Sequence, residues 1–288
     1  MKILLIQEKG RHDKNRNFRE CEVMKKSLTD LGIDCTIWGL KYENFKVPFE
    51  EIVEDKDVIF SIENYDSGWV PKLSKYKEKL KIFWSVDSHC ALRSHLKVVT
   101  ENKFDIVLNS IDSHQFYFNK FSKTYYFPNA YPDYLIYPKK EIKKEYDVGF
   151  CGSIIADRKQ WLNLISSRFK LKQDIFVIGN DMVNAINSYK ICFNKTLADD
   201  INYRFFETLG CETALITNCP PGAESLFEDQ KHLIYYKNHL DLMDKIQYYL
   251  NNENDLFEIA KAGHTLVKEK HTYASRAKYL LEIIDENS

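Results

Sequence analysis

Short apolar runs alternate with segments of helical periodicity along the whole chain. The runs are three to six residues long and are bounded by polar or turn residues, as expected of strands buried in a parallel sheet. In the first half of the chain we predict strands at residues 3–6, 33–38, 57–62, 81–86, 105–109 and 124–128. Between the first two, Cys21, Met24, Leu28 and Leu31 recur at helical spacing, and Gly32 ends that helix. This alternation predicts an α/β fold.

A second alternating set follows a segment, 129–144, that has prolines, four lysines and little periodicity. We predict its strands at residues 147–151, 175–178, 191–193, 213–217 and 232–235, with helices over 157–169 and from 203 onward. Three helices complete the chain. The last carries an apolar stripe formed by Ala277, Leu280, Leu281 and Ile284. The pattern therefore predicts two α/β halves joined by a linker.

Composition narrows the class of protein. The 41 basic and 42 acidic side chains leave a net charge of −1, which gives no overall basic footprint for nucleic acid. No apolar run approaches 18 residues, and residues 1–7 are too short for a signal peptide, so we expect a cytoplasmic protein without a membrane span. The seven cysteines form no C-x-x-C pair, which argues against a disulfide frame or zinc site. No G-x-G-x-x-G follows the first strand, which disfavours a Rossmann oxidoreductase.

The stretch 194–222 holds the densest set of candidate binding residues. Asn202 is a good N-cap for a helix that starts at Tyr203, and Arg204 and Glu207 lie three positions apart on one face of it. The free N–H groups of a helix N-terminus, together with an arginine, form an anion site. A glutamate one turn deeper can accept a hydrogen bond from a sugar hydroxyl. The alternative is a solvated surface pair that contributes a few tenths of a kcal/mol.

Two neighbouring positions add to this predicted diphosphate site. Gly149 and Gly152, with Ser153, join a strand to a helix, where glycine lets the backbone approach a phosphate; a merely tight turn is the alternative. Arg158 adds a cation in that helix, and Asn194 ends a strand facing the same edge.

In the first half, Asp87 and His89 stand at the end of the strand 81–86. Such a histidine can accept the proton of a substrate hydroxyl, while the aspartate fixes the tautomer of the imidazole. The two side chains share a side only if the backbone stays extended, and a structural histidine is the alternative. His95 on the next helix is a weaker candidate, and Glu63 is a second polar strand end that could contact an acceptor.

Four segments resemble CgeB-like glycosyltransferases. They read N-x-R-x-x-E at Asn202, E-x-L-F at Glu224, H-T-Y-x-x-R at His271, and D-V-x-F-x-G-S-x-x-x-x-R at Asp147. The resemblance covers roughly residues 80–288 and departs at Glu212, where that family more often has glycine, so the turn after the helix could differ.

The resemblance implies a GT-B fold, in which two Rossmann-like domains face across a cleft and the C-terminal helix crosses back to the N-terminal domain. It places the acceptor domain at residues 1–137 with 273–288, the linker at 138–145 and the donor domain at 146–272. The implied activity is metal-independent transfer of a hexosyl or pentosyl group from a nucleotide diphosphate sugar, with UDP the expected nucleotide and no other cofactor. The donor-binding residues would be Gly152, Ser153, Arg158, Asn194, Asn202, Arg204 and Glu207, and the catalytic residues His89 and Asp87.

Other functions remain open at this point. The acceptor could be a glycan, a protein or DNA; transfer to DNA bases, as by phage-type glucosyltransferases, would be favoured by a clustered basic face. A non-catalytic nucleotide-sugar-binding protein would bind the donor but show neither transfer nor slow donor hydrolysis.

Overall fold

The computed structural model describes residues 1–287, which form two compact units. The N-terminal unit combines Met1–Pro128 with the segment that begins at Tyr273, and the C-terminal unit is Asn129–Thr272. The segment 129–145, which the sequence analysis divided between the acceptor domain and a linker, is held to the C-terminal unit. The amide N–H of Tyr131 donates to the carbonyl of His271 (3.2 Å), and that of Lys139 donates to the side chain of Asn187 (2.8 Å).

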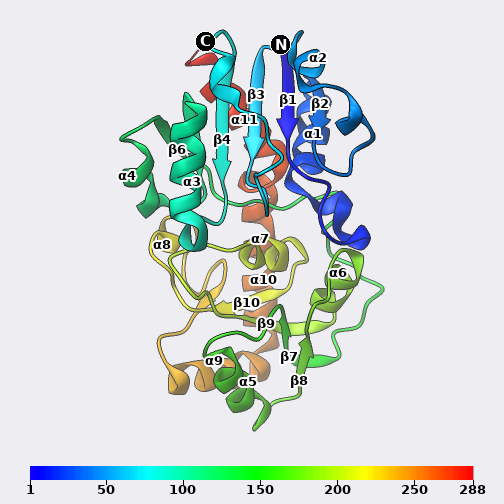
Figure 1. Ribbon diagram of the computed structural model, residues 1–288. Coiled ribbons are helices and arrows are strands. Elements are labelled where there is room, and N and C mark those ends of the chain that lie inside the picture. Colours follow the sequence, from blue (N-terminus) through cyan, green and yellow to red (C-terminus); the bar gives the residue numbers. More distant parts are fainter. Residues whose placement is uncertain (288) are drawn as a thin grey trace. The chain divides into compact units, whose positions relative to one another are not determined.

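Six parallel strands form the sheet of the N-terminal unit, in the order β2-β1-β3-β4-β5-β6 (Figure 1). Their bounds are β1 (Lys2–Ile6), β2 (Asp34–Trp38), β3 (Val58–Ile62), β4 (Leu80–Ser85), β5 (Ile106–Asn109) and β6 (Lys123–Tyr126). Every residue of β3 and β5 is buried. These strands are therefore covered on both faces, which is why their sequences are continuous apolar runs and not alternating ones.

The helices of this unit are α1 (Glu20–Asp30), α2 (Phe49–Val53), α3 (Ser88–Asn102), α4 (Gln115–Phe118) and α11 (Tyr273–Asp285), with short 3-10 turns η1 (Asp13–Phe18), η2 (Glu43–Lys46), η3 (Leu73–Lys75) and η4 (Asp112–His114). The C-terminal helix α11 packs against α1. Its buried Arg276 donates from Nε to the carbonyl of Pro128 (2.7 Å), and the ring of Tyr273 lies 6.3 Å from that of Trp84 on β4. The end of the chain is thus part of the N-terminal unit, as a GT-B fold requires.

The C-terminal unit has a second parallel sheet, of five strands in the order β11-β10-β9-β7-β8. Its strands are β7 (Tyr146–Cys151), β8 (Leu171–Asp174), β9 (Tyr189–Asn194), β10 (Ala214–Thr217) and β11 (Ile234–Tyr235). Its helices are α5 (Arg158–Ser166), α6 (Asn180–Asn187), α7 (Tyr203–Gly210), α8 (Ala223–Leu226), α9 (His239–Asn251) and α10 (Glu253–Lys270). Among all the helices that the structure describes, none is long and apolar enough to cross a membrane.

One predicted strand is misplaced. The apolar run 175–178 is not a strand but part of the loop after β8, where Phe176 is 81% exposed and has a left-handed φ of 56°. The strand is instead the more polar Leu171–Asp174, which pairs only with β7 at the edge of the sheet. Edge strands bury less apolar surface and often carry lysine, so their sequence signal is weak.

Gly149 has a packing role that the sequence does not reveal. A Cβ on this residue of β7 would lie 2.0 Å from the ring of Tyr189 on the neighbouring strand β9. Tyr189 is fully buried, and its hydroxyl donates to Asp174. Glycine is therefore required here by the tyrosine ring, whereas Gly152, with φ at 155°, is required by its backbone conformation.

We therefore predict that Gly149→Ala lowers the free energy of unfolding by about 1–3 kcal/mol or more, because the added methyl group overpacks a fixed ring. The measurement is chemical denaturation of the full chain. Gly68→Ala is the matched control: the atoms nearest to its Cβ would be those of the flexible side-chain carboxylate of Asp66, at 3.2 Å or more. Equal stability of the two variants would contradict this explanation of Gly149.

Candidate functional site

Two groups of polar residues lie at the carboxyl ends of strands, one in each unit. In the C-terminal unit the first contact is the cap of helix α7. The Oδ1 atom of Asn202 accepts a hydrogen bond from the amide of Arg204 (3.1 Å), as the sequence predicts. The side-chain amides of Asn202 and of buried Asn194, at the end of β9, lie 3.4 Å apart. The Nδ2 atom of Asn194 also donates to the hydroxyl of Thr217 at the end of β10 (3.1 Å). These contacts fix the start of α7 against two strand ends.

Arg204 and Glu207 form a largely buried ion pair. The distance from Nη1 of Arg204 to Oε2 of Glu207 is 3.0 Å, and each side chain is 16% exposed. Burial alone would lower the pKa of Arg204, but the charge of the Glu207 carboxylate outweighs it, and the pKa is raised. The guanidinium is therefore a permanent positive charge. The pair differs from the solvated surface pair considered above, because its charges have lost most of their water.

Arg158 connects two loops of the same edge. Its Nε and Nη2 donate to the carbonyl of Lys195 (3.0 and 2.7 Å), and its Nη1 donates to the carbonyl of Ser153 (2.9 Å). The amide of Gly152 donates to the carbonyl of Asp174 (3.1 Å). Three donors of Arg158 thus hold backbone carbonyls, and the turn after β7 is fixed from both sides. Direct phosphate binding by Gly152, Ser153 and Arg158 stays a prediction.

The turn after α7 has a left-handed residue at Glu212, the position where the sequence departs from the CgeB-like pattern. This residue has a φ of 51°, the left-handed conformation that glycine adopts most readily. Its amide donates to the carbonyl of Leu209 (3.0 Å), which closes the helix end. The chain therefore takes at Glu212 the conformation that suits a glycine.

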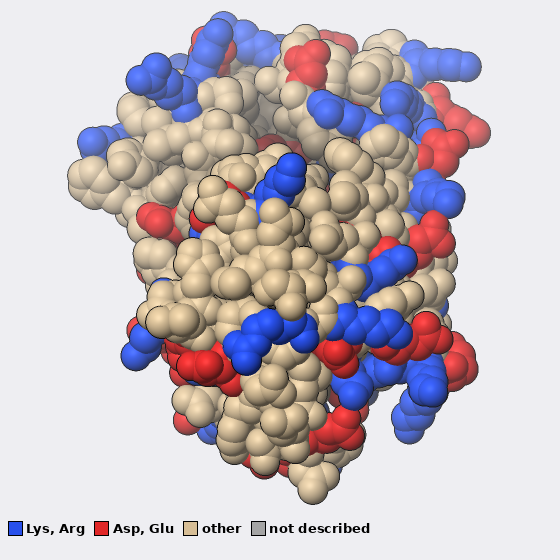
Figure 2. Space-filling model, turned by 90° about the horizontal axis from the view of Figure 1, so that it is seen from below, with Lys and Arg blue, Asp and Glu red and all other residues tan. Residues whose placement is uncertain are grey.

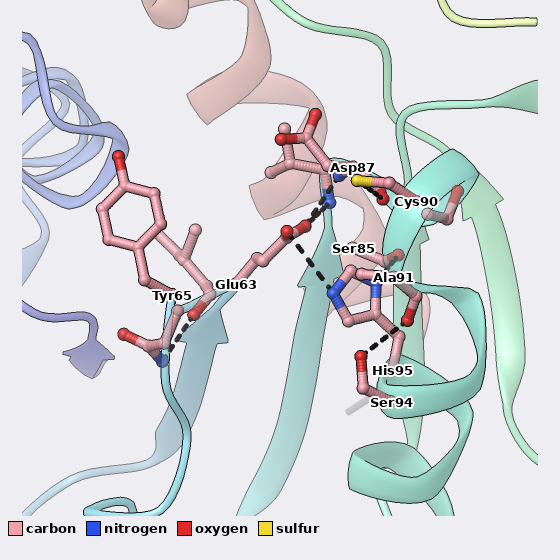
Figure 3. Close-up of polar contacts among 12 residues, drawn as sticks. Glu63, Tyr65, Ser85, Asp87, Cys90, Ala91, Ser94 and His95 are labelled. Atoms are coloured by element: carbon pink, nitrogen blue, oxygen red, sulfur yellow. Dashed lines mark hydrogen bonds and ion pairs between the residues drawn. The ribbon is translucent and has the colours of Figure 1, made fainter. Parts of the chain in front are cut away.

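In the N-terminal unit the central residue is Glu63, directly after β3. Its Oε2 accepts hydrogen bonds from the amides of Val86 (2.8 Å) and Asp87 (2.7 Å), and its Oε1 lies 3.4 Å from Nε2 of His95 (Figure 3). The other ring nitrogen of His95, Nδ1, is 2.8 Å from the hydroxyl of Ser85. One carboxylate thereby joins the end of β3, the turn after β4 and helix α3.

The charge of Glu63 is maintained by these contacts. Burial alone would raise the pKa of Glu63, but the hydrogen bond of His95 and those of the two backbone amides outweigh it, so the pKa is lowered. His95 is 5% exposed and packs edge-on against the ring of Phe83. Both of its nitrogens have partners, which suits a positioning role better than that of a base.

A cavity of about 810 Å³ adjoins this group, between the segment 63–72 and helix α3. Glu63, Tyr65, Asp87 and Ser94 are among its lining residues. This volume lies within the range for small-molecule sites.

The structure separates the two predicted catalytic residues. Helix α3 begins at Ser88, and Asp87 has φ −102° and ψ 46°, so the extended backbone that would align Asp87 with His89 is absent. Asp87 lines the cavity, whereas His89 is exposed and is not one of the described lining residues. The contact between Glu63 and His95, which lie 32 positions apart, was not predicted. Two sequence features could have indicated it: a glutamate directly after a buried strand, and a histidine on the helix after the next strand.

Within residues 1–287, no group of three or more His, Cys, Asp or Glu side chains is arranged to hold a metal ion.

Comparison with solved structures identifies the fold. Sucrose-phosphate synthase from Thermosynechococcus elongatus superposes with a TM-score of 0.69 at 11% identity, over 99% of this chain and 98% of that one. HepE from Anabaena in complex with UDP-glucose gives 0.68 at 11%, over 99% and 100%. The β-glucosyltransferase of phage T4 gives 0.69 at 17%, over 99% and 100%. The protein therefore has the GT-B fold.

Sequence comparison identifies the family. No curated protein matches the chain significantly. The sequence model of the glycosyl transferase-like family matches residues 136–282, which is just over half of the chain and includes Asn202, Arg204 and Glu207. On this match, the chain belongs to the glycosyl transferase-like family.

Proposed function

We propose that the protein transfers a sugar from a UDP-sugar to an acceptor without a metal ion, and that it belongs to the CgeB-like subgroup. The observation that carries the proposal is the buried Arg204–Glu207 pair behind the capped start of α7, within the segment that the family model matches. A helix N-terminus and a permanent cation suit a diphosphate, and a carboxylate suits the hydroxyls of a sugar. HepE was solved with UDP-glucose, which makes UDP-glucose the first donor to test.

For a direct displacement, the acceptor hydroxyl loses its proton as its oxygen bonds to the anomeric carbon. The bond from that carbon to the diphosphate breaks, and the diphosphate leaves with the electron pair. The positive charge of Arg204 and the amides at the start of α7 would stabilise the leaving group. Asp87, held in place by Glu63 and lining the cavity, is our candidate to accept the proton.

Transfer to DNA is the second candidate, because the α-glucosyltransferase solved with UDP and DNA shares the fold, with a TM-score of 0.70 at 11% identity. The face of the molecule in Figure 2 shows basic and acidic side chains interspersed, not gathered by sign.

A non-catalytic nucleotide-sugar-binding protein remains the alternative from another class. It would bind UDP-glucose without transferring or hydrolysing it.

Glu207 provides the first test. We expect Glu207→Ala to weaken binding of UDP-glucose by about 1.5–3 kcal/mol, the scale for hydrogen bonds to a charged group, measured by calorimetry. The alanine also leaves Arg204 buried without its partner, so the melting temperature should fall, and Glu207→Gln separates the two effects by keeping the shape. Glu253→Gln, an exposed carboxylate paired with Lys190, is the charge-matched control. Unchanged affinity in both Glu207 variants would remove Glu207 from the donor site.

Chelation tests the metal independence. The sequence has no D-x-D at the carboxyl end of a strand, since Asp55-Lys56-Asp57 precedes β3. We therefore expect transfer or donor hydrolysis to continue in excess EDTA. Loss of turnover on chelation, followed by recovery with manganese or magnesium, would contradict the proposal.

Two variants separate the candidate bases. If Asp87 accepts the proton, Asp87→Asn lowers kcat by roughly 10²–10⁴-fold, while donor affinity and melting temperature stay near those of the wild type. His89→Ala, a change at an exposed position, should then lower kcat by a much smaller factor. The reverse order, with the larger loss in His89→Ala, would restore the assignment made from the sequence.

A further inference from the structure

We propose that the cavity beside Glu63 binds the acceptor, and that it selects a hydroxyl-rich molecule that is uncharged or cationic. Phosphate-bearing acceptors, DNA among them, would be rejected. This inference rests on the proposed function and names the class of its second substrate. It is argued from the groups that line the cavity within the N-terminal unit (Figure 3).

The lining of the cavity contains both apolar and polar side chains. Val70, Phe83, Val98 and Phe104 contribute carbon surface, and carboxylates, hydroxyls and amides are also part of the lining. A sugar ring combines the same two features, since its C–H groups are apolar and its hydroxyls point outward. The volume of about 810 Å³ leaves room for more than one such ring.

The charges that face the cavity are predominantly negative. Its lining contains four carboxylates, from Glu63, Asp66, Asp87 and Glu101, and one ammonium group, from Lys72. Their formal sum is −3. Two guanidinium groups face the ring of Tyr65, that of Arg11 at 4.1 Å and that of Arg19 at 4.7 Å. Arg19 is paired with the carboxylates of Glu8 and Glu20, so only Arg11 is added to the sum, which becomes −2. Because apolar walls strengthen the field of such groups, a phosphate would be repelled.

The hydrogen-bonding groups point to the same class. Asp66 uses one oxygen to accept from the amide of Gly68 (2.9 Å), which leaves its second oxygen as an acceptor. The hydroxyl of Ser94 donates to the carbonyl of Ala91 (2.8 Å) and so offers only lone pairs. A cavity rich in acceptors requires a ligand that supplies donors. Hydroxyl and ammonium groups do so, and a phosphate dianion does not.

The experiment compares three sugars of similar size that differ in charge, together with a short DNA. Binding of glucose, glucosamine, glucose 6-phosphate and a short single-stranded DNA to the full chain is measured by ligand-observed NMR, without donor. We expect glucosamine and glucose to bind roughly tenfold or more tightly than glucose 6-phosphate, with no specific binding of the DNA. In the double variant Asp66→Asn, Glu101→Gln this preference should shrink several-fold. Glu43→Gln, an exposed carboxylate of the same unit outside the cavity, should leave it unchanged.

The outcomes separate this inference from the proposed function. Donor binding is measured independently by calorimetry with UDP. If UDP binds but glucose 6-phosphate or DNA binds as tightly as glucosamine, the acceptor class is wrong and the proposed function stands. Failure of glucose and glucosamine to bind, or a preference that the double variant leaves intact, also overturns the inference. If UDP does not bind, the proposed function fails, whereas the sugar series still tests the cavity.

Discussion

Both units depend on one constraint: where a strand is followed by a helix, backbone N–H groups have no partner within either element and need another acceptor. A parallel sheet places many such junctions at one edge, and each buried donor needs an acceptor. Side chains from neighbouring segments supply them: Glu63 accepts from the amides of Val86 and Asp87, Asn202 from that of Arg204, and Asn218 from that of Thr196. The polar side chains at these strand ends therefore hold the fold and the candidate sites at the same time.

The two candidate sites have opposite electrostatic character. In the C-terminal unit, Arg204 keeps its charge because Glu207 compensates its burial, and it lies in the first turn of a capped helix. In the N-terminal unit, the carboxylate of Glu63 keeps its charge because amides and an imidazole face it. The proposed donor site thus contains a permanent cation at a helix start, whereas the proposed acceptor site has an excess of carboxylates. A donor that carries a diphosphate and an acceptor that carries hydroxyls would each meet the complementary set.

Local features could be predicted from the sequence, and long-range contacts could not. The Asn202 cap and the buried strands follow from a few adjacent residues, so the α/β fold and the start of α7 agree with expectation. The predicted strand at 175–178 was wrong because the edge strand β8 is polar, whereas the apolar run that follows it is a loop. The contacts of Glu63 with Val86, Asp87 and His95 depend on how β3 and β4 pair, which no local pattern encodes. The same limit led the sequence analysis to pair Asp87 with its near neighbour His89.

The carboxylate of Glu63 also links the N-terminal unit to the proton concentration. Its pKa is lower in the folded chain than in the unfolded one, so the unfolded state binds a proton first on acidification. Its contribution to stability is fully present above the unfolded pKa and disappears as the pH falls through the folded value. Protonation would weaken the bonds to the amides of Val86 and Asp87 and release the turn that carries Asp87. Acid would then loosen the junction of β3, β4 and α3, and the reaction centre proposed here would lose its geometry along with its charge.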